Sequence, residues 1–140
     1  LLFTAFLLMG GLILNQRLGT WQIPSAWLEK AGEDIYSAGM INITTISGVF
    51  LGLGCGIAVL KTRGEYSAQG TLLQKSLRYG LGLAGVFLLW AGLDMLFPEG
   101  DSITALSLRL IRYSLVGFWI SCGAPLLFWR LKLAARETIE

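Results

Sequence analysis

The sequence predicts an all-α integral membrane bundle of about four transmembrane helices, with one additional interfacial amphipathic helix. The 140 residues are 54% hydrophobic and only 14% charged, whereas soluble domains carry about 25% charged residues. The apolar residues fall in long blocks between short polar segments. One block, residues 37–60, holds 24 residues without a charge, and a helix needs about 20 such residues to cross a bilayer. These observations indicate a single membrane domain.

The first apolar block, residues 1–14, is too short for a complete membrane span. A secretory signal would carry positive residues before its apolar core, and none precede this block. We therefore expect the block to be a truncated first helix and the chain to be a fragment of a longer protein.

Residues 24–36 predict a short amphipathic helix that lies along the membrane surface. Pro24 suits the first turn of a helix. Trp21 and Trp27 combine an apolar ring with one N–H donor, as is typical of side chains at the membrane–water boundary. We expect these two tryptophans to be interfacial anchors.

The span over residues 37–60 carries a regular series of glycines. Gly48, Gly52 and Gly56 recur at every fourth position and so fall on one helix face. Small residues at this spacing allow another helix backbone to approach closely in a membrane. We predict that this face packs against a neighbouring helix.

Two further spans are predicted at residues 77–97 and 106–131, and Pro125 should bend the second of these. Residues 80–85 match the GxGxxG pattern of dinucleotide-binding loops, but that motif requires a preceding strand and a helix that begins at the glycines. Helix packing is the better interpretation of Gly80 and Gly85, and we expect the same role for Gly117.

Asp94, Arg109 and Arg112 form a charged cluster near one end of these two spans. A charge within the membrane costs about 2.5–3.5 kcal/mol on insertion scales, so such groups usually have partners. An ion pair between Asp94 and one of the arginines is the first interpretation. An anion or lipid-headgroup site formed by the arginines is the alternative.

The distribution of lysine and arginine predicts the orientation. Four spans place seven basic residues at one membrane face and four at the other, and the richer face should be cytoplasmic. Both chain ends then lie in the cytoplasm. The richer face receives Lys61, Arg63, Lys75, Arg78, Arg130, Lys132 and Arg136, and the other receives Arg17, Lys30, Arg109 and Arg112.

The composition also excludes several classes of function. The chain has no histidine, which removes the commonest general base, metal ligand and axial ligand of haem. No catalytic residue, cofactor or metal site is predicted. The net charge of +2 without a basic run does not indicate nucleic acid as a partner. Bound lipid is expected, and a pigment would need a ligand other than imidazole.

The second half of the chain resembles a known family. The similar segments are residues 77–98 and 109–134, which include Arg78-Tyr79-Gly80, Phe97-Pro98 and Gly123-Ala124-Pro125. They resemble the C-terminal membrane region of bacterial and cyanobacterial membrane phosphatases of the PAP2 superfamily. The catalytic motifs of such enzymes, among them a PSGH stretch, do not occur in this sequence. The resemblance therefore implies a non-catalytic transmembrane module that packs against the helices of a catalytic core.

A second hypothesis is a small accessory subunit of a respiratory or photosynthetic membrane complex, in which the glycine faces would seal contacts with other helices. Its membrane would be a bacterial inner membrane or a photosynthetic membrane. Transport is a weaker third hypothesis, because the charges lie near the ends of the spans rather than around a site at mid-membrane.

Overall fold

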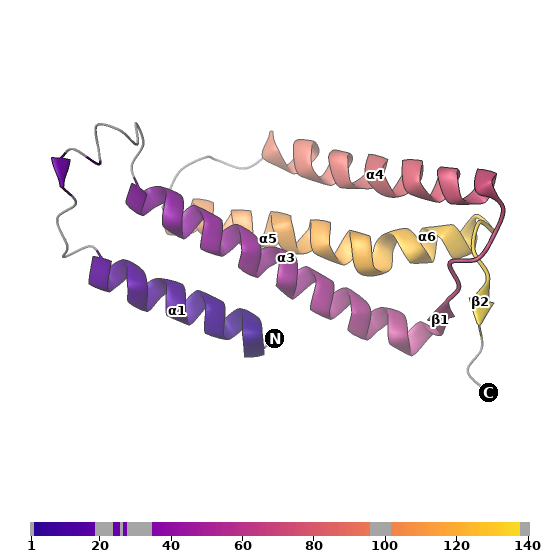
Figure 1. Cartoon of the computed structure of the whole chain (residues 1–140), viewed down its shortest axis with the longest axis horizontal. Helices are drawn as coiled ribbons and strands as arrows, with labels where there is room; N and C mark the ends of the chain where they lie inside the picture. The colour runs from indigo at the N-terminus through magenta and orange to yellow at the C-terminus, as the bar shows by residue number, and fades with distance from the viewer. Residues whose placement is uncertain (1, 19–23, 26, 28–34, 96–101, 138–140) are drawn as a thin grey trace.

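The computed structural model describes residues 2–18, 24–25, 27, 35–95 and 102–137 of the chain. These residues are almost entirely helical, which confirms the predicted all-α class (Figure 1). The helical segments are α1 (Leu2–Leu18), α3 (Ile35–Arg63), α4 (Leu72–Asp94), α5 (Ile103–Phe118), the π-helical η1 (Trp119–Gly123) and α6 (Ala124–Arg130).

Three helical segments are long and apolar enough to cross a membrane, and they coincide with the three full spans predicted from the sequence. They are Gly39–Arg63, Leu72–Asp94 and Ile103–Arg130. The shorter α1 is also apolar, and its 17 residues extend beyond the predicted 1–14. The chain is therefore an integral membrane protein by its fold.

The predicted interfacial helix at residues 24–36 falls largely outside the described residues, as does Trp21. Within the described part, the backbone N–H of Trp27 donates to the carbonyl of Pro24 at 2.9 Å, and the Trp27 side chain is exposed. The next helix, α3, already begins at Ile35.

The helices α4 and α5 begin before the predicted spans because capping side chains, rather than the first apolar residues, fix their starts. The hydroxyl of Thr71 accepts from the backbone N–H of Gln74, whose side chain accepts from the backbone N–H of Thr71. This reciprocal pair is a capping box. Ser102 likewise accepts from the backbone N–H of Ala105 at 3.2 Å.

The helices are arranged as a row, with the main packing contact between α3 and α5. One side of α3 contacts α1, and its other side contacts α5 and η1. The last row member, α4, packs against α5, η1 and α6. Figure 1 shows that α3 and α5 run in the same direction, whereas α1 and α4 run in the opposite direction.

The helices α5 and α6 form one continuous helical segment that is interrupted by the wider, π-helical turn of η1. The backbone N–H of Ala124 donates to the carbonyl of Trp119, five residues earlier, as in a π-helix. Pro125 follows at the start of α6. The proline, which cannot donate an N–H, therefore lies at a change of helix type rather than within a regular α-helix.

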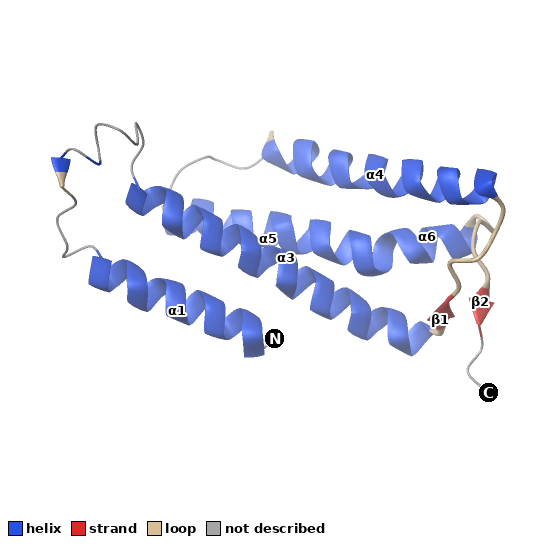
Figure 2. Cartoon of the chain, in the orientation of Figure 1, coloured by secondary structure: helices blue, strands red, loops and turns tan. Residues whose placement is uncertain are grey.

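Two short strands close one end of the row. β1 (Glu65–Tyr66) pairs antiparallel with β2 (Arg136–Glu137), as Figure 2 shows. This pairing brings the connection after α3 next to the segment that follows α6, which the sequence did not predict.

Candidate functional site

The glycine face of α3, formed by Gly48, Gly52 and Gly56, lies directly against α5 and η1. A Cβ added at Gly48 would be 2.7 Å from the carbonyl oxygen of Leu110, and one at Gly52 would overlap the carbonyl oxygen of Ser114. The corresponding atom at Gly56 would overlap the hydroxyl of Ser121. The contact is therefore between backbones, and it leaves no room for a methyl group.

Gly117 makes the same kind of contact from the α5 side. A Cβ there would be 2.5 Å from the carbonyl oxygen of Val49 and 2.9 Å from the backbone nitrogen of Leu53. Along this contact, later residues of α3 meet later residues of α5, as expected for parallel helices.

The glycines of α4 behave differently from one another. Gly85 lies against the indole of Trp119, which an added Cβ would overlap, and the indole N–H donates to the carbonyl of Gly82 at 3.1 Å. Gly80, in contrast, is exposed, and an added Cβ would meet no atom of the described residues within 4 Å. Gly80 therefore does not contribute to packing between the described helices, contrary to expectation, because it points away from α5.

The structure brings Asp94 of α4 and Arg112 of α5 into an ion pair. The Arg112 side chain is 8% exposed, whereas that of Asp94 is 43% exposed. The guanidinium also lies 5.0 Å from the ring centroid of Tyr113, whose hydroxyl accepts a long hydrogen bond of 3.4 Å from Nη2. Arg109 is half-buried and takes no part in this pair. The geometry is that of a clasp between two helices rather than of an open anion site.

A second buried arginine, Arg78, organises the loop at the opposite end of α4. Its Nη1 donates to the hydroxyl of Tyr66 at 3.2 Å and to the carbonyl of Ala68 at 3.1 Å. Its Nη2 donates to the carbonyl of Gln69 at 2.9 Å. The sequence predicts Arg78 only as part of the cytoplasmic charge, because loop carbonyls leave no pattern that identifies them as partners.

Gly70 permits this arrangement. Its φ of +145° is a conformation that residues with a side chain rarely adopt. A Cβ there would also be 2.7 Å from Nη2 of Arg78. The loop can therefore wrap around the guanidinium only because this position lacks a side chain.

We predict that Arg78→Lys will loosen the 64–71 loop and lower the free energy of unfolding by about 2 kcal/mol, because a lysine cannot reach three acceptors in a fork. Hydrogen exchange of the loop amides and an unfolding titration in lipid–detergent mixtures would measure both effects. Lys75→Gln, one turn earlier on α4 and exposed, is the control. If Arg78→Lys were no less stable than the wild type, Arg78 would act only through its charge and not through its hydrogen bonds.

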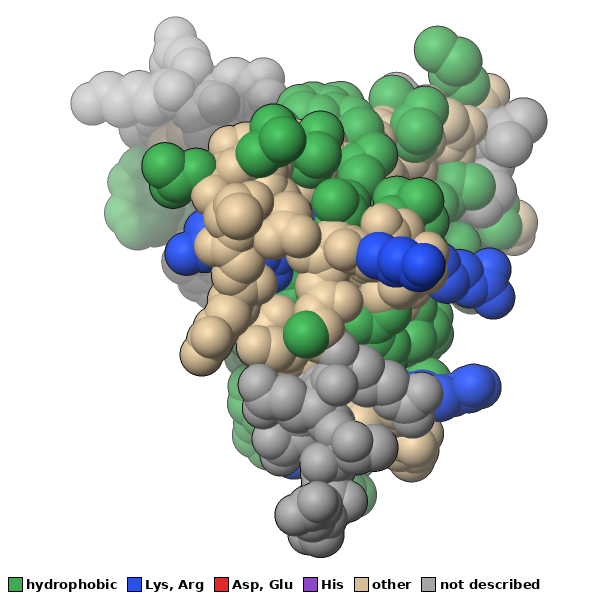
Figure 3. Space-filling model, turned by 90° about the vertical axis from the view of Figure 1, so that its right-hand side faces the viewer, with side chains coloured by type: hydrophobic (Ala, Val, Ile, Leu, Met, Phe, Trp, Pro, Cys, Tyr) green, Lys and Arg blue, Asp and Glu red, His purple; other side chains and the backbone are tan. Residues whose placement is uncertain are grey.

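The end of the row that carries β1 and β2 is the basic end of the molecule. The last turn of α3, the first turn of α4 and the end of α6 meet there (Figure 1). Lysine and arginine side chains project from this face between apolar ones, as Figure 3 shows. The exposed basic residues of these elements are Lys61, Arg63, Lys75, Arg130 and Lys132.

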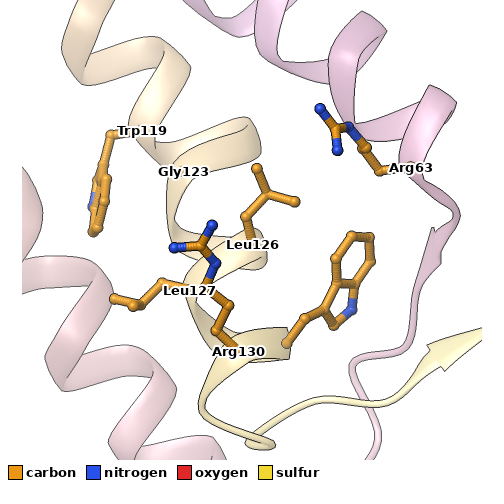
Figure 4. Close-up of a pocket in the computed structure, with 7 residues that line it drawn as sticks. Arg63, Trp119, Gly123, Leu126, Leu127 and Arg130 are labelled. Carbon is orange, nitrogen blue, oxygen red and sulfur yellow. The ribbon is translucent and has the colours of Figure 1, made fainter.

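A pocket of about 490 Å³ opens at this basic end, between the last turn of α3 and the η1–α6 segment. Arg63 and Arg130 both line it, and Figure 4 shows their guanidinium groups on either side of Leu126, with Trp119 beyond Arg130. The lining is completed by Gly123, Leu127 and Trp129. The pocket thus combines two cations with indole and leucine walls. The pocket could not be predicted from the sequence, because its two arginines are 67 positions apart (130 minus 63).

Trp129 is held in place by the closing strands. Its indole N–H donates to the carbonyl of Ala135 at 3.2 Å, and its ring lies 6.4 Å from that of Tyr66, centroid to centroid. The pocket wall is therefore connected to the same loop that Arg78 organises. Among the described residues, no group of three or more acidic or thiol side chains could hold a metal ion.

Comparison with known proteins gives one finding. The model of the family described as PAP2 superfamily phosphatase, transmembrane extension, matches residues 44–136. No curated protein and no solved structure matches this chain. The matched region starts within α3 and includes α4, α5, η1 and α6, and thus the glycine face, both buried arginines and the pocket. The chain belongs to the family of transmembrane extensions of PAP2 superfamily phosphatases.

Proposed function

We propose that this chain is a non-catalytic transmembrane module that packs against the membrane helices of a phosphatase catalytic core. The observation that carries the proposal is the absence of histidine from all 140 residues in a chain of this family. Without histidine, the PSGH-type catalytic motif of PAP2 phosphatases cannot be formed by these residues. The family match also favours this hypothesis over an accessory subunit of a respiratory or photosynthetic complex.

The outer face of α4 is our candidate for the contact with the core. Its inner face is fixed by the Asp94–Arg112 pair, by Arg78 and by the contact of Gly85 with Trp119. Its outer face carries large apolar side chains that are exposed in this chain, with Leu88 at 75% and Phe87 at 58%. In a membrane, such a face contacts either lipid or another helix.

We further propose that the basic end faces the cytoplasm, because lysine and arginine are enriched on the cytoplasmic side of membrane proteins. The described ends of the chain, in α1 and β2, both point toward this end of the row (Figure 1). This arrangement agrees with cytoplasmic termini.

A photo-cross-linking amino acid at Leu88 tests the packing proposal. In native membranes, we expect irradiation to join this position to another membrane segment of the phosphatase. The control position is Val86, which lines a pocket of about 300 Å³ together with Ile120 and Phe128 and should cross-link within the chain.

Two results would contradict the proposal. Cross-linking from Leu88 to lipid alone would show that the outer face of α4 has no protein partner. Release of phosphate from a lipid phosphate monoester by these 140 residues in nanodiscs would show that the module is itself catalytic.

A further inference from the structure

We propose that the pocket between Arg63 and Arg130 is a binding site for an anionic phospholipid, with the two guanidinium groups on the phosphodiester and an acyl chain along the apolar wall. The lipid is a bound structural component of the bilayer rather than a substrate. The inference rests on the membrane fold and is independent of the proposed catalytic partner.

The position and the charge of the two arginines suit a phosphate group in the headgroup layer. Arg63 and Arg130 are the last residues of α3 and α6, so both lie where a membrane helix reaches the headgroup layer. Both side chains are exposed, and both line the same pocket. Neither forms an ion pair with a carboxylate in the part of the chain that the structure describes. Arginine presents a planar fork that matches phosphate oxygens, and two forks from different helices define a site.

The apolar wall next to the arginines suits an acyl chain. Trp119, Leu126 and Leu127 line the pocket. Trp119 precedes Arg130 by 11 residues, which corresponds to a depth of about 16 Å at a rise of ~1.5 Å per residue. This depth is close to half of the ~30 Å hydrocarbon layer. A free phosphate would use only the charged mouth, whereas a lipid uses both the mouth and the wall.

The pocket walls are held in place by contacts within the chain. Trp119 is fixed to α4 through its indole N–H, and Trp129 is fixed to the closing segment through its own. Gly123 lies against the ring of Trp119, where an added Cβ would be 2.6 Å from the nearest ring atom. The walls are therefore set by contacts within the chain before a lipid binds, which reduces the ordering cost of binding.

The test is native mass spectrometry of the intact protein with added phosphatidylglycerol or phosphatidylcholine of the same acyl chains. We expect selective retention of phosphatidylglycerol by the wild type. The variant Arg63→Gln/Arg130→Gln should bind it at least ~10-fold more weakly, since two charge-assisted contacts are removed. The matched control is Lys61→Gln/Lys132→Gln, which removes the same charge from the same end outside this pocket and should change binding by less than about twofold.

Three results would overturn the proposal. Equal retention of the two lipids by the wild type would exclude a headgroup site, and this measurement does not depend on any variant folding. Equal losses in the two double variants would show diffuse attraction to the basic end. Displacement of phosphatidylglycerol by millimolar inorganic phosphate would identify a site for soluble phosphate instead of lipid.

Discussion

Replacing Gly52 with alanine is expected to force α3 away from α5 and to lower the free energy of unfolding by about 3 kcal/mol, the upper range for overpacking. The added methyl group would overlap the carbonyl oxygen of Ser114, and it would lie 2.8 Å from the backbone nitrogen of Phe118. Both obstacles are helix backbone, so a change of rotamer cannot relieve the clash. An unfolding titration in mixed micelles measures the loss.

Gly54→Ala is the matched control for this prediction. Gly54 lies two residues further along the same helix, where an added Cβ meets nothing within 4 Å among the described residues. Because alanine has a higher helix propensity than glycine, the control should be neutral or slightly stabilising. Equal destabilisation by both substitutions would mean that α3 and α5 do not approach closely at Gly52.

The second large effect is expected from Asp94→Leu. The substitution leaves the guanidinium of Arg112 buried without its carboxylate, since the Arg112 side chain is 8% exposed. Removing one partner of a fully buried pair costs about 3–5 kcal/mol, and we expect about 2 kcal/mol here because Asp94 itself is partly solvated. The same unfolding titration provides the measurement.

The double variant Asp94→Leu/Arg112→Met distinguishes an ion pair from simple packing. Replacing both charges by apolar side chains removes the buried charge altogether, so most of the stability lost in Asp94→Leu should return. Arg109→Gln is the control, because Arg109 lies on the same helix and outside the pair. If the double variant were no more stable than Asp94→Leu, Asp94 would contribute through a contact other than Arg112.

Features set by helical periodicity could be predicted from the sequence. Gly48, Gly52 and Gly56 recur once per turn, and any such row must face one side of its helix. The sequence could not identify α5 as the neighbour, because spacing within one helix carries no information about its partner. The same limit explains Gly80, which shares a small-residue pattern with Gly85 but lies on the outward side of α4.

Features made by backbone groups could not be predicted. The acceptors of Arg78 are two loop carbonyls, the carbonyl of Gln74 in α4 and the hydroxyl of Tyr66, and every residue has a carbonyl. The β1–β2 pair spans only two residues on each side, too few to show an alternating pattern. The helix starts at Leu72 and Ile103 were missed for a related reason, since polar capping residues precede the apolar positions by which the spans were recognised.

The parallel arrangement of α3 and α5 has a consequence for biosynthesis. In a chain that crosses the membrane back and forth, two parallel helices cannot be consecutive in the sequence. Here α4 lies between α3 and α5 in the chain and is therefore synthesised before α5. The glycine face of α3, formed by Gly48, Gly52 and Gly56, therefore has no contact with α5 until α5 has been synthesised. Assembly of this chain therefore depends on the stability of α3 in the bilayer without α5, with α1 as the partner that precedes it in the chain.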